Sequence, residues 1–384
     1  MKKRLNIDPE SLVPTLPKAQ DLKPFPTVRC IKYITPPNAD GETPRIRGIG
    51  ASPDGQWLAS GGEDGFVRLF EVQTGKLVRS WDLSGFAGEG EPIAVASVEF
   101  NPLKTHAVLL CVVSCTVVVI NTGKGSAVEQ EITEGLLRVG MAGGGALSEK
   151  AKKSVTWETS SDMIVLKLQN KATCAKWHRR GDYFVTVTPK ANAAAVLIHQ
   201  LSKGSSQQPF SKNKGDISCA CFHPNKPFLF VANNSHVRIY HLIKQTLVKK
   251  LVSGCKQISD MSVHPSGDHL IVGSLDRKMS WFDLDLSSTP YKTLKYHENA
   301  IRSVGFHPRY PLMASASDDG NVHVFHSTVY DDLLRNPLVV PVKVLRNAHE
   351  VKGRLGALRV AWHPVLPWIF TCGADGQITL WQDV

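Results

Sequence analysis

Short apolar runs alternate with polar turns along most of this chain of 384 residues. Seven times, an apolar strand pattern runs into a turn marked by Pro or Gly, and a second strand pattern follows. The third residues of these turns are Pro53, Pro102, Arg179, Pro224, Pro265, Pro308 and Pro364. The steps between them are 49, 77, 45, 41, 43 and 56 residues, so most of the chain repeats one unit.

A period of about 40–45 residues with four strands in each unit is typical of a WD-type β-propeller. We therefore predict an all-β fold, a seven-bladed WD-type β-propeller over residues 27–384, preceded by an extended Pro-rich arm over residues 1–26. Residues 27–34 form a strand pattern before the first turn, and residues 377–381 form the last one. Because an open ring would expose unpaired strand edges, we expect the N-terminal strand to close the last blade.

The two longest steps indicate insertions. The first lies in blade 2, at about residues 123–161, and is Gly-rich and basic with few apolar residues. We expect it to be mobile, with the fourth strand of the blade at residues 163–168. The second covers residues 331–337 of blade 6, where a short helical turn is expected at residues 331–334.

Within the blades, some polar residues recur at fixed spacing. In blade 7 they have the spacing of the WD-repeat hydrogen-bond tetrad and are His349, Thr371, Asp375 and Trp381. Blade 6 repeats the pattern with His297, Ser315 and Asp319, but Phe325 stands in place of the Trp, and blade 1 keeps Ser60 and Asp64 without an evident His. A Ser-His-Asp set can also be a catalytic triad, but repetition with the blade period favours a structural role.

Charge is unevenly distributed along the chain. The formal net charge is +11, and residues 101–300 carry all of it, with 25 basic and 14 acidic residues. Such an excess favours RNA or an acidic protein face as a partner. A solvated surface that only keeps the protein soluble is the alternative.

Clustered basic residues are the candidate phosphate contacts. They are Lys150, Lys152, Lys153, Lys176, Arg179, Arg180, Lys212, Lys214, Lys249 and Lys250. Few aromatic residues lie among them, so we expect salt-sensitive RNA binding with little sequence preference.

Arg68 is the candidate protein-partner contact in blade 1. It lies in a strand pattern on the parity of Phe66 and Phe70, and aromatic neighbours can hold a guanidinium rigid for an interface. Arg45 and Arg47 would extend the same basic face. The alternative is an ion pair with a nearby acid such as Glu71 or one on a neighbouring blade.

No catalytic or metal-binding motif stands out from the repeat, and no cofactor is expected. Cys219, Cys221 and His223 lack a second Cys/His pair at zinc spacing, which favours core thiols. The eight cysteines form no C-x-x-C pair, as in proteins of reducing compartments. No signal peptide is visible, and no apolar run is long enough for a membrane span, so a soluble intracellular protein is expected.

The N-terminal segment is not generic WD-repeat sequence. Together with the first and last blades, it resembles the block-of-proliferation family of eukaryotic ribosome biogenesis proteins, and the resemblance covers essentially the whole chain. The segments that carry it are Leu5-Asn6-Ile7-Asp8-Pro9-Glu10-Ser11-Leu12, Asp21-Leu22-Lys23-Pro24-Phe25-Pro26-Thr27, Arg45-Ile46-Arg47-Gly48-Ile49-Gly50-Ala51-Ser52-Pro53-Asp54-Gly55 and His297-Glu298-Asn299-Ala300-Ile301-Arg302-Ser303-Val304.

The resemblance implies a scaffold without a catalytic residue that acts in large ribosomal subunit assembly and pre-rRNA processing, in the nucleolus and nucleoplasm of the nucleus. It implies three partners: a second WD-repeat protein with a ubiquitin-like domain, pre-ribosomal RNA, and a pescadillo-type protein held mainly by an N-terminal half that this chain lacks. Two alternatives remain, a propeller enzyme using the central pocket and a phosphopeptide-reading adaptor. The latter needs several Arg residues at matched positions of one face, which the sequence offers only sparsely.

Overall fold

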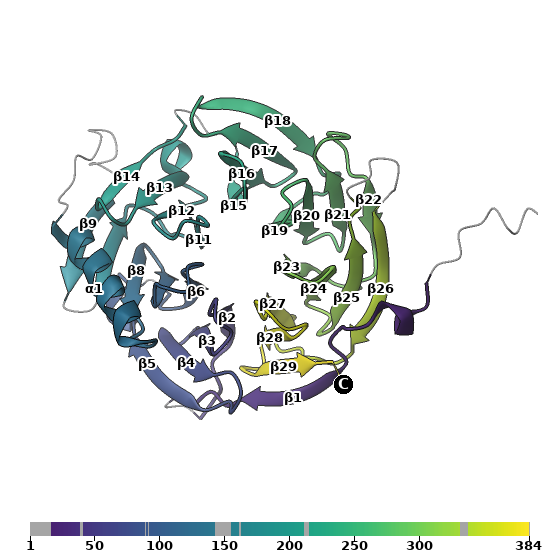
Figure 1. The fold of residues 1–384 in the computed structure, drawn as a ribbon, viewed down its shortest axis with the longest axis horizontal. Coiled ribbons are helices and arrows are strands. Elements are labelled where there is room, and N and C mark those ends of the chain that lie inside the picture. The colour runs from purple at the N-terminus through teal and green to yellow at the C-terminus, as the bar shows by residue number, and fades with distance from the viewer. Residues whose placement is uncertain are drawn as a thin grey trace, which may run out of the picture.

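The computed structural model describes residues 17–38, 41–88, 90, 92–142, 155–160, 163–210, 215–330 and 337–383. Seven antiparallel sheets stand around a common axis, as Figure 1 shows. This confirms the predicted seven-bladed β-propeller. The lysines at 150, 152, 153, 212 and 214 and the expected helical turn at 331–334 lie outside the described residues.

Each blade runs from an innermost strand at the axis to an outermost strand at the rim. The innermost strands are β2 (Ile46–Ala51), β6 (Val95–Phe100), β11 (Cys174–Trp177), β15 (Ile217–Phe222), β19 (Ile258–Val263), β23 (Ile301–Phe306) and β27 (Ala357–Trp362). The second strands are β3 (Trp57–Gly62), β7 (Val108–Val113), β12 (Tyr183–Val187), β16 (Phe228–Asn233), β20 (His269–Ser274), β24 (Leu312–Ser317) and β28 (Ile369–Gly373).

The outer half of each blade follows the same order. The third strands are β4 (Phe66–Glu71), β8 (Thr116–Asn121), β13 (Val196–Gln200), β17 (His236–His241), β21 (Met279–Asp283), β25 (Val322–Thr328) and β29 (Ile378–Gln382). The fourth strands are β5 (Leu77–Asp82), β10 (Met163–Leu168), β14 (Ser205–Gln207), β18 (Thr246–Val252), β22 (Lys292–Leu294), β26 (Leu338–Leu345) and β1 (Val28–Tyr33).

The core lies between neighbouring blades. Every residue of β7 and of β20 is buried, because each of these strands packs on both faces. Strands buried on both sides carry continuous apolar runs in place of an alternating pattern, which explains the Val- and Leu-rich sequence of β7.

The first and last strands close the ring. β1 pairs antiparallel with β29, with Tyr33 opposite Ile378, which confirms the expected closure. The buried hydroxyl of Tyr33 donates a hydrogen bond of 2.8 Å to the carbonyl oxygen of Val72 in blade 1. The closing strand thus contacts both the last blade and the first.

The insertion in blade 2 carries more regular structure than the sequence led us to expect. It contains a helix, α1 (Ala127–Ala142), and a fifth strand, β9 (Val155–Ser160), which pairs with β10 outside the predicted fourth strand. Ser126 and Glu129 form a capping box: the Ser126 amide donates 2.6 Å to Glu129 Oε2, and the Glu129 amide donates 3.3 Å to Ser126 Oγ. That Ser-x-x-Glu signal was present in the sequence.

Three short 3₁₀ helices complete the described structure, η2 (Ala19–Leu22), η3 (Ser84–Phe86) and η4 (Asn192–Ala194). In the described parts of the chain, no helix has the length and apolar character needed to cross a membrane.

Candidate partner-binding surfaces

The side chains predicted to form a tetrad in blade 7 lie within hydrogen-bond distance of one another. His349 Nδ1–H donates to Asp375 Oδ1 over 3.0 Å, and the Thr371 hydroxyl lies 2.9 Å from His349 Nε2. Trp381 Nε1–H donates to Thr371 Oγ1 over 3.0 Å. Burial opposes ionisation of Asp375, but hydrogen bonds from His349 and from backbone amides hold its pKa below the usual value. The group is buried inside the blade, where it can support structure and cannot reach a substrate.

Arg68 lies inside blade 1. Only 6% of its side chain is exposed, and it forms an ion pair with Asp64, whose side chain is equally buried. Asp64 occupies the position of the tetrad Asp, so Arg68 neutralises it in a blade that has no tetrad His. This is the local ion pair considered as the alternative, with Asp64 as the acid in place of Glu71. A buried, paired guanidinium is not available as a surface contact.

Arg45 and Arg47 remain accessible beside Glu63. Arg47 Nε–H donates to Glu63 Oε1 over 2.6 Å, and Arg45 Nη1 lies 3.7 Å from Glu63 Oε2. The side chain of Arg45 is 38% exposed and that of Arg47 is 35% exposed. Of the three residues predicted for the partner interface, these two keep a basic group at the surface.

Lys176 lines the inside of the ring, where the sequence analysis had expected a phosphate contact. It shares a cavity of about 290 Å³ with Glu99, Asp260 and Arg359. Burial disfavours the ammonium, but nearby negative groups, with Asp260 first, together raise the pKa of Lys176. Burial raises the pKa of Glu99 to about 7, although Lys176 and the Trp177 amide oppose this. The positive charge of Lys176 is therefore balanced by nearby acids inside the central channel of the ring.

Arg179 and Arg180 lie on a groove of about 610 Å³ between blades 3 and 4. Both side chains are exposed, and Arg179 Nη1–H donates to Asn225 Oδ1 over 2.7 Å. Tyr183 and Phe222 line the same groove, so two aromatic rings accompany the two guanidinium groups. The sequence predicted few aromatic residues among the basic ones, and the fold brings Phe222 from the next blade to Tyr183.

Lys249 and Lys250 lie on the rim strand β18. Lys249 Nζ donates to the carbonyl oxygen of Leu284 over 2.5 Å, and Lys250 is exposed. Neither of these two lysines lines the groove to which Arg179 and Arg180 belong. The described residues among the predicted phosphate contacts thus occupy three separate places and do not form one continuous patch.

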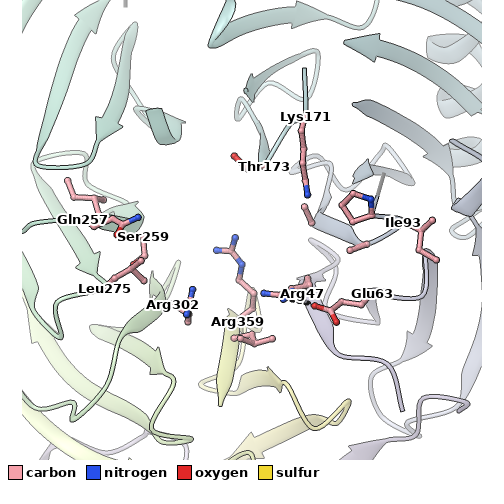
Figure 2. Close-up of a pocket in the computed structure, with 15 residues that line it drawn as sticks. Arg47, Glu63, Ile93, Lys171, Thr173, Gln257, Ser259, Leu275, Arg302 and Arg359 are labelled. Carbon is pink, nitrogen blue, oxygen red and sulfur yellow. Dashed lines mark hydrogen bonds and ion pairs between the residues drawn. The ribbon is translucent and has the colours of Figure 1, made fainter. Parts of the chain in front are cut away.

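The structure brings together basic residues that the sequence analysis had left apart. Arg47, Arg302, Arg359 and Lys171 line one cavity of about 780 Å³ where the innermost strands begin (Figure 2). A repeated signal could have found two of them, because Arg47 and Arg302 each take the second position of an innermost strand. Each also bonds an acid 16 residues later, Glu63 and Asp318 respectively.

Metal binding finds no support at the cysteines examined in the sequence. Cys219 and Cys221 are buried, and burial raises the pKa of Cys221 to about 12, so its thiol stays protonated. Among the described residues, no group of three or more His, Cys, Asp or Glu side chains could hold a metal ion.

Comparison with known proteins gives both a repeat family and similar chains. The family model "WD domain, G-beta repeat" matches residues 29–71, 204–241, 245–283, 288–326 and 341–382, just over half of the chain. The chain is 46% identical over 394 residues to ribosome biogenesis protein bop1-B of Xenopus laevis, which covers 99% of the chain and 50% of that relative.

Two further relatives show the same relationship. Ribosome biogenesis protein erb1 of Schizosaccharomyces pombe is 43% identical, covering 98% of the chain and 53% of the relative. Ribosome biogenesis protein BOP1 of Homo sapiens is 42% identical, with 99% and 49% covered. The chain thus spans about half the length of these relatives, whose names are those of ribosome biogenesis proteins and not of enzymes. They confirm the resemblance drawn from the motifs, and the chain belongs to the WD domain, G-beta repeat family.

Proposed function

We propose that this propeller is a scaffold in large ribosomal subunit assembly and pre-rRNA processing, acting in the nucleolus and nucleoplasm. The names of its relatives support a role in ribosome biogenesis. In this proposal the ring is rigid and holds partners on separate surfaces. One surface binds pre-ribosomal RNA and another binds a second WD-repeat protein that carries a ubiquitin-like domain.

The groove between blades 3 and 4 is the observation that carries the RNA proposal. Two exposed guanidinium groups supply phosphate contacts, and two aromatic rings in the same groove offer stacking for unpaired bases. Arg179 is also held in place by its bond to Asn225. Phosphate contacts give salt-dependent binding without a sequence code.

The test is RNA binding of the double variant Arg179→Gln and Arg180→Gln. Affinity for a single-stranded RNA oligonucleotide should fall at least tenfold, and the slope of log affinity against log salt should decrease by about 1.4, since each single-strand phosphate contact contributes about 0.7. Lys76→Gln is the matched control, because Lys76 is an exposed cation on the outer hairpin of blade 1. An unchanged salt slope, or an equal loss in the control, would remove this groove from the proposal.

For the second WD-repeat protein, we assign the contact in blade 1 to Arg45. Its side chain is 38% exposed and only distantly paired. Arg45→Glu should abolish capture of that partner while the melting temperature stays unchanged. Normal capture would exclude this edge of blade 1. The pescadillo-type partner stays an implication of the family resemblance, to which no described surface is assigned.

A further inference from the structure

Four basic side chains meet at the mouth of the channel, where the innermost strands begin. Arg47, Arg302 and Arg359 come from blades 1, 6 and 7, and Lys171 precedes β11 of blade 3. In Figure 2 the guanidinium of Arg359 stands in the hollow, and Lys171 extends into it from another wall. Among the residues that the structure describes, Glu63 is the one carboxylate that lines this cavity.

Buried carboxylates fix the arginines in position. Asp318 Oδ2 accepts hydrogen bonds from Arg302 Nε–H and lies 2.7 Å from its Nη2, and Asp260 Oδ2 accepts from Arg359 Nη1–H over 3.2 Å. A guanidinium has five N–H donors, so these contacts leave donors for a ligand. About a third of each arginine side chain is exposed, 33% for Arg302 and 28% for Arg359. Because the groups are held before a ligand arrives, less rotamer entropy is lost on binding.

Of the four cations, Lys171 is the most available to a ligand. Its side chain is exposed, and it takes part in none of the ion pairs found in the described part of the chain. A flexible ammonium beside a fixed guanidinium can adjust to the position of an incoming anion. Lys171 and Arg359 are therefore the pair most available to one.

The cavity wall also carries apolar groups. Ile93 is 40% exposed, and Pro92, Leu275 and Leu358 lie around the same hollow. The described residues that line it include no aromatic side chain. Single-stranded nucleic acid gains much of its affinity from stacking on aromatic rings, which this wall does not offer. A peptide can place side chains on apolar and charged positions alike.

The charge balance favours an anionic ligand. Three described carboxylates, Glu63, Asp260 and Asp318, bind or approach the four cations, and Glu63 also lies beside Arg45, so the described groups keep an excess of positive charge. One positive charge neutralises a carboxylate monoanion, whereas a phosphoserine carries −1.5 to −2 at neutral pH.

We propose that the channel mouth binds an acidic peptide segment of a partner protein, with an Asp or Glu carboxylate between Arg359 and Lys171 and apolar side chains against Ile93 and Leu275. Its volume of about 780 Å³ is that of pockets that enclose a compact ligand. The site goes beyond the proposed function, since it uses neither the groove between blades 3 and 4 nor Arg45. Arg47 and Arg302, each at the second position of an innermost strand, also supply matched arginines of the kind that the sequence offers only sparsely.

The test uses a fluorescein-labelled decapeptide in which Glu alternates with Ala and Leu, and a second peptide with Gln in place of every Glu. Fluorescence anisotropy with the whole chain should show the Glu peptide binding at least tenfold more tightly. Lys171→Gln and Arg359→Gln should each weaken that binding about tenfold, the effect of one charge-assisted hydrogen bond. Lys76→Gln, which removes an exposed cation far from the mouth, should leave it unchanged.

Arg359→Gln removes a partner of buried Asp260, so thermal unfolding is recorded in parallel. Lys171→Gln breaks no ion pair in the described structure and keeps the test decisive if the first variant fails to fold. The proposal is overturned if the Gln peptide binds equally well or if Lys171→Gln binds as tightly as the unchanged protein. It is also overturned if single-stranded RNA displaces the Glu peptide and loses tenfold with Lys171→Gln, which would assign the mouth to nucleic acid. A phosphoserine peptide that binds more than tenfold more tightly than the Glu peptide would overturn the choice of carboxylate.

Discussion

His363 in blade 7 donates a hydrogen bond of 3.2 Å from Nε2–H to the carbonyl oxygen of Gly55 in blade 1, which lies 308 residues earlier in the sequence. Its Nδ1 accepts hydrogen bonds from the amides of Val365 and Leu366, so the ring is held as a neutral tautomer. This His-Pro turn thus does more than reverse the chain. It also joins one blade to the next and closes the ring on the face opposite the channel mouth.

Other turns of the repeat make the same connection. His307 donates from Nε2–H to the carbonyl oxygen of Leu366 over 2.8 Å. In blade 2, Asn101 replaces the His and its Nδ2–H donates to the carbonyl oxygen of Gly181 over 2.7 Å. Asn and His serve equally because both have a donor and an acceptor at the required positions.

Replacing Gly55 by Ala should destabilise the ring more than its backbone conformation alone explains. Gly55 has φ +80°, and a Cβ there would lie 2.3 Å from His363 Nε2. Gly254 is a matched control, with φ +66° and no atom within 4 Å of a Cβ. We expect Gly254→Ala to cost about 1 kcal/mol and Gly55→Ala about 3 kcal/mol, because the clash adds to the strain. Urea unfolding compares the two, and equal losses would show that His363 does not limit this turn.

Stability should fall in mild acid because His307 is held neutral. Burial lowers the pKa of His307 to about 4, and the nearby His363 and Arg309 also disfavour the cation. An unfolded His has a pKa of about 6.5, so between pH 6.5 and 4 the unfolded chain binds a proton that the folded chain does not. The contribution of neutral His307 to the free energy of unfolding is fully present above pH 6.5, and it is about 3 kcal/mol smaller at pH 4.

The variant His307→Asn separates this contribution from other titrating groups. Asn copies the natural choice at position 101 and cannot titrate, so its free energy of unfolding should decline less between pH 6.5 and 4.5 than that of the unchanged protein. Urea unfolding at several pH values measures both. Parallel declines would mean that His307 is already charged in the fold or does not matter.

Asp375→Ala should destabilise blade 7. The carboxylate accepts hydrogen bonds from His349 and from the amides of Glu350 and Gln377, and its loss leaves buried donors without a partner. We expect a loss of about 3 kcal/mol, seen as a lower melting temperature. Asp285→Ala, at an exposed position, is the control and should change little. An unchanged melting temperature for Asp375→Ala would remove the structural role of the tetrad.

Two ion pairs with the same spacing should differ because of burial. Arg68 and Asp64 are each 6% exposed, whereas Arg138 and Glu134 are 79% and 53% exposed. Arg68→Ala leaves a buried carboxylate unpaired and should cost about 3–5 kcal/mol, while Arg138→Ala should cost less than about 0.5 kcal/mol. The double change Arg68→Ala with Asp64→Ala should recover part of the loss. If Arg68→Ala were as stable as the unchanged protein, Arg68 would return as a candidate contact.

The sequence by itself determined the repeat, the number of blades and the closing strand. Apolar periodicity, turn residues at regular steps and the need to pair an open edge are local or additive signals, so they can be read along the chain. The tetrad of blade 7 was equally readable, because its members recur at fixed spacing within one blade.

Only the tertiary structure decided which charges are free. Arg68 and Lys176 look like surface cations in the sequence, but the fold buries one against Asp64 and turns the other into the channel. Conversely, Arg302 and Arg359 meet Lys171 only because the ring brings blades 6, 7 and 3 to one mouth. Whether a charge is paired, buried or exposed depends on neighbours from distant segments, and closing the ring is what makes those segments neighbours.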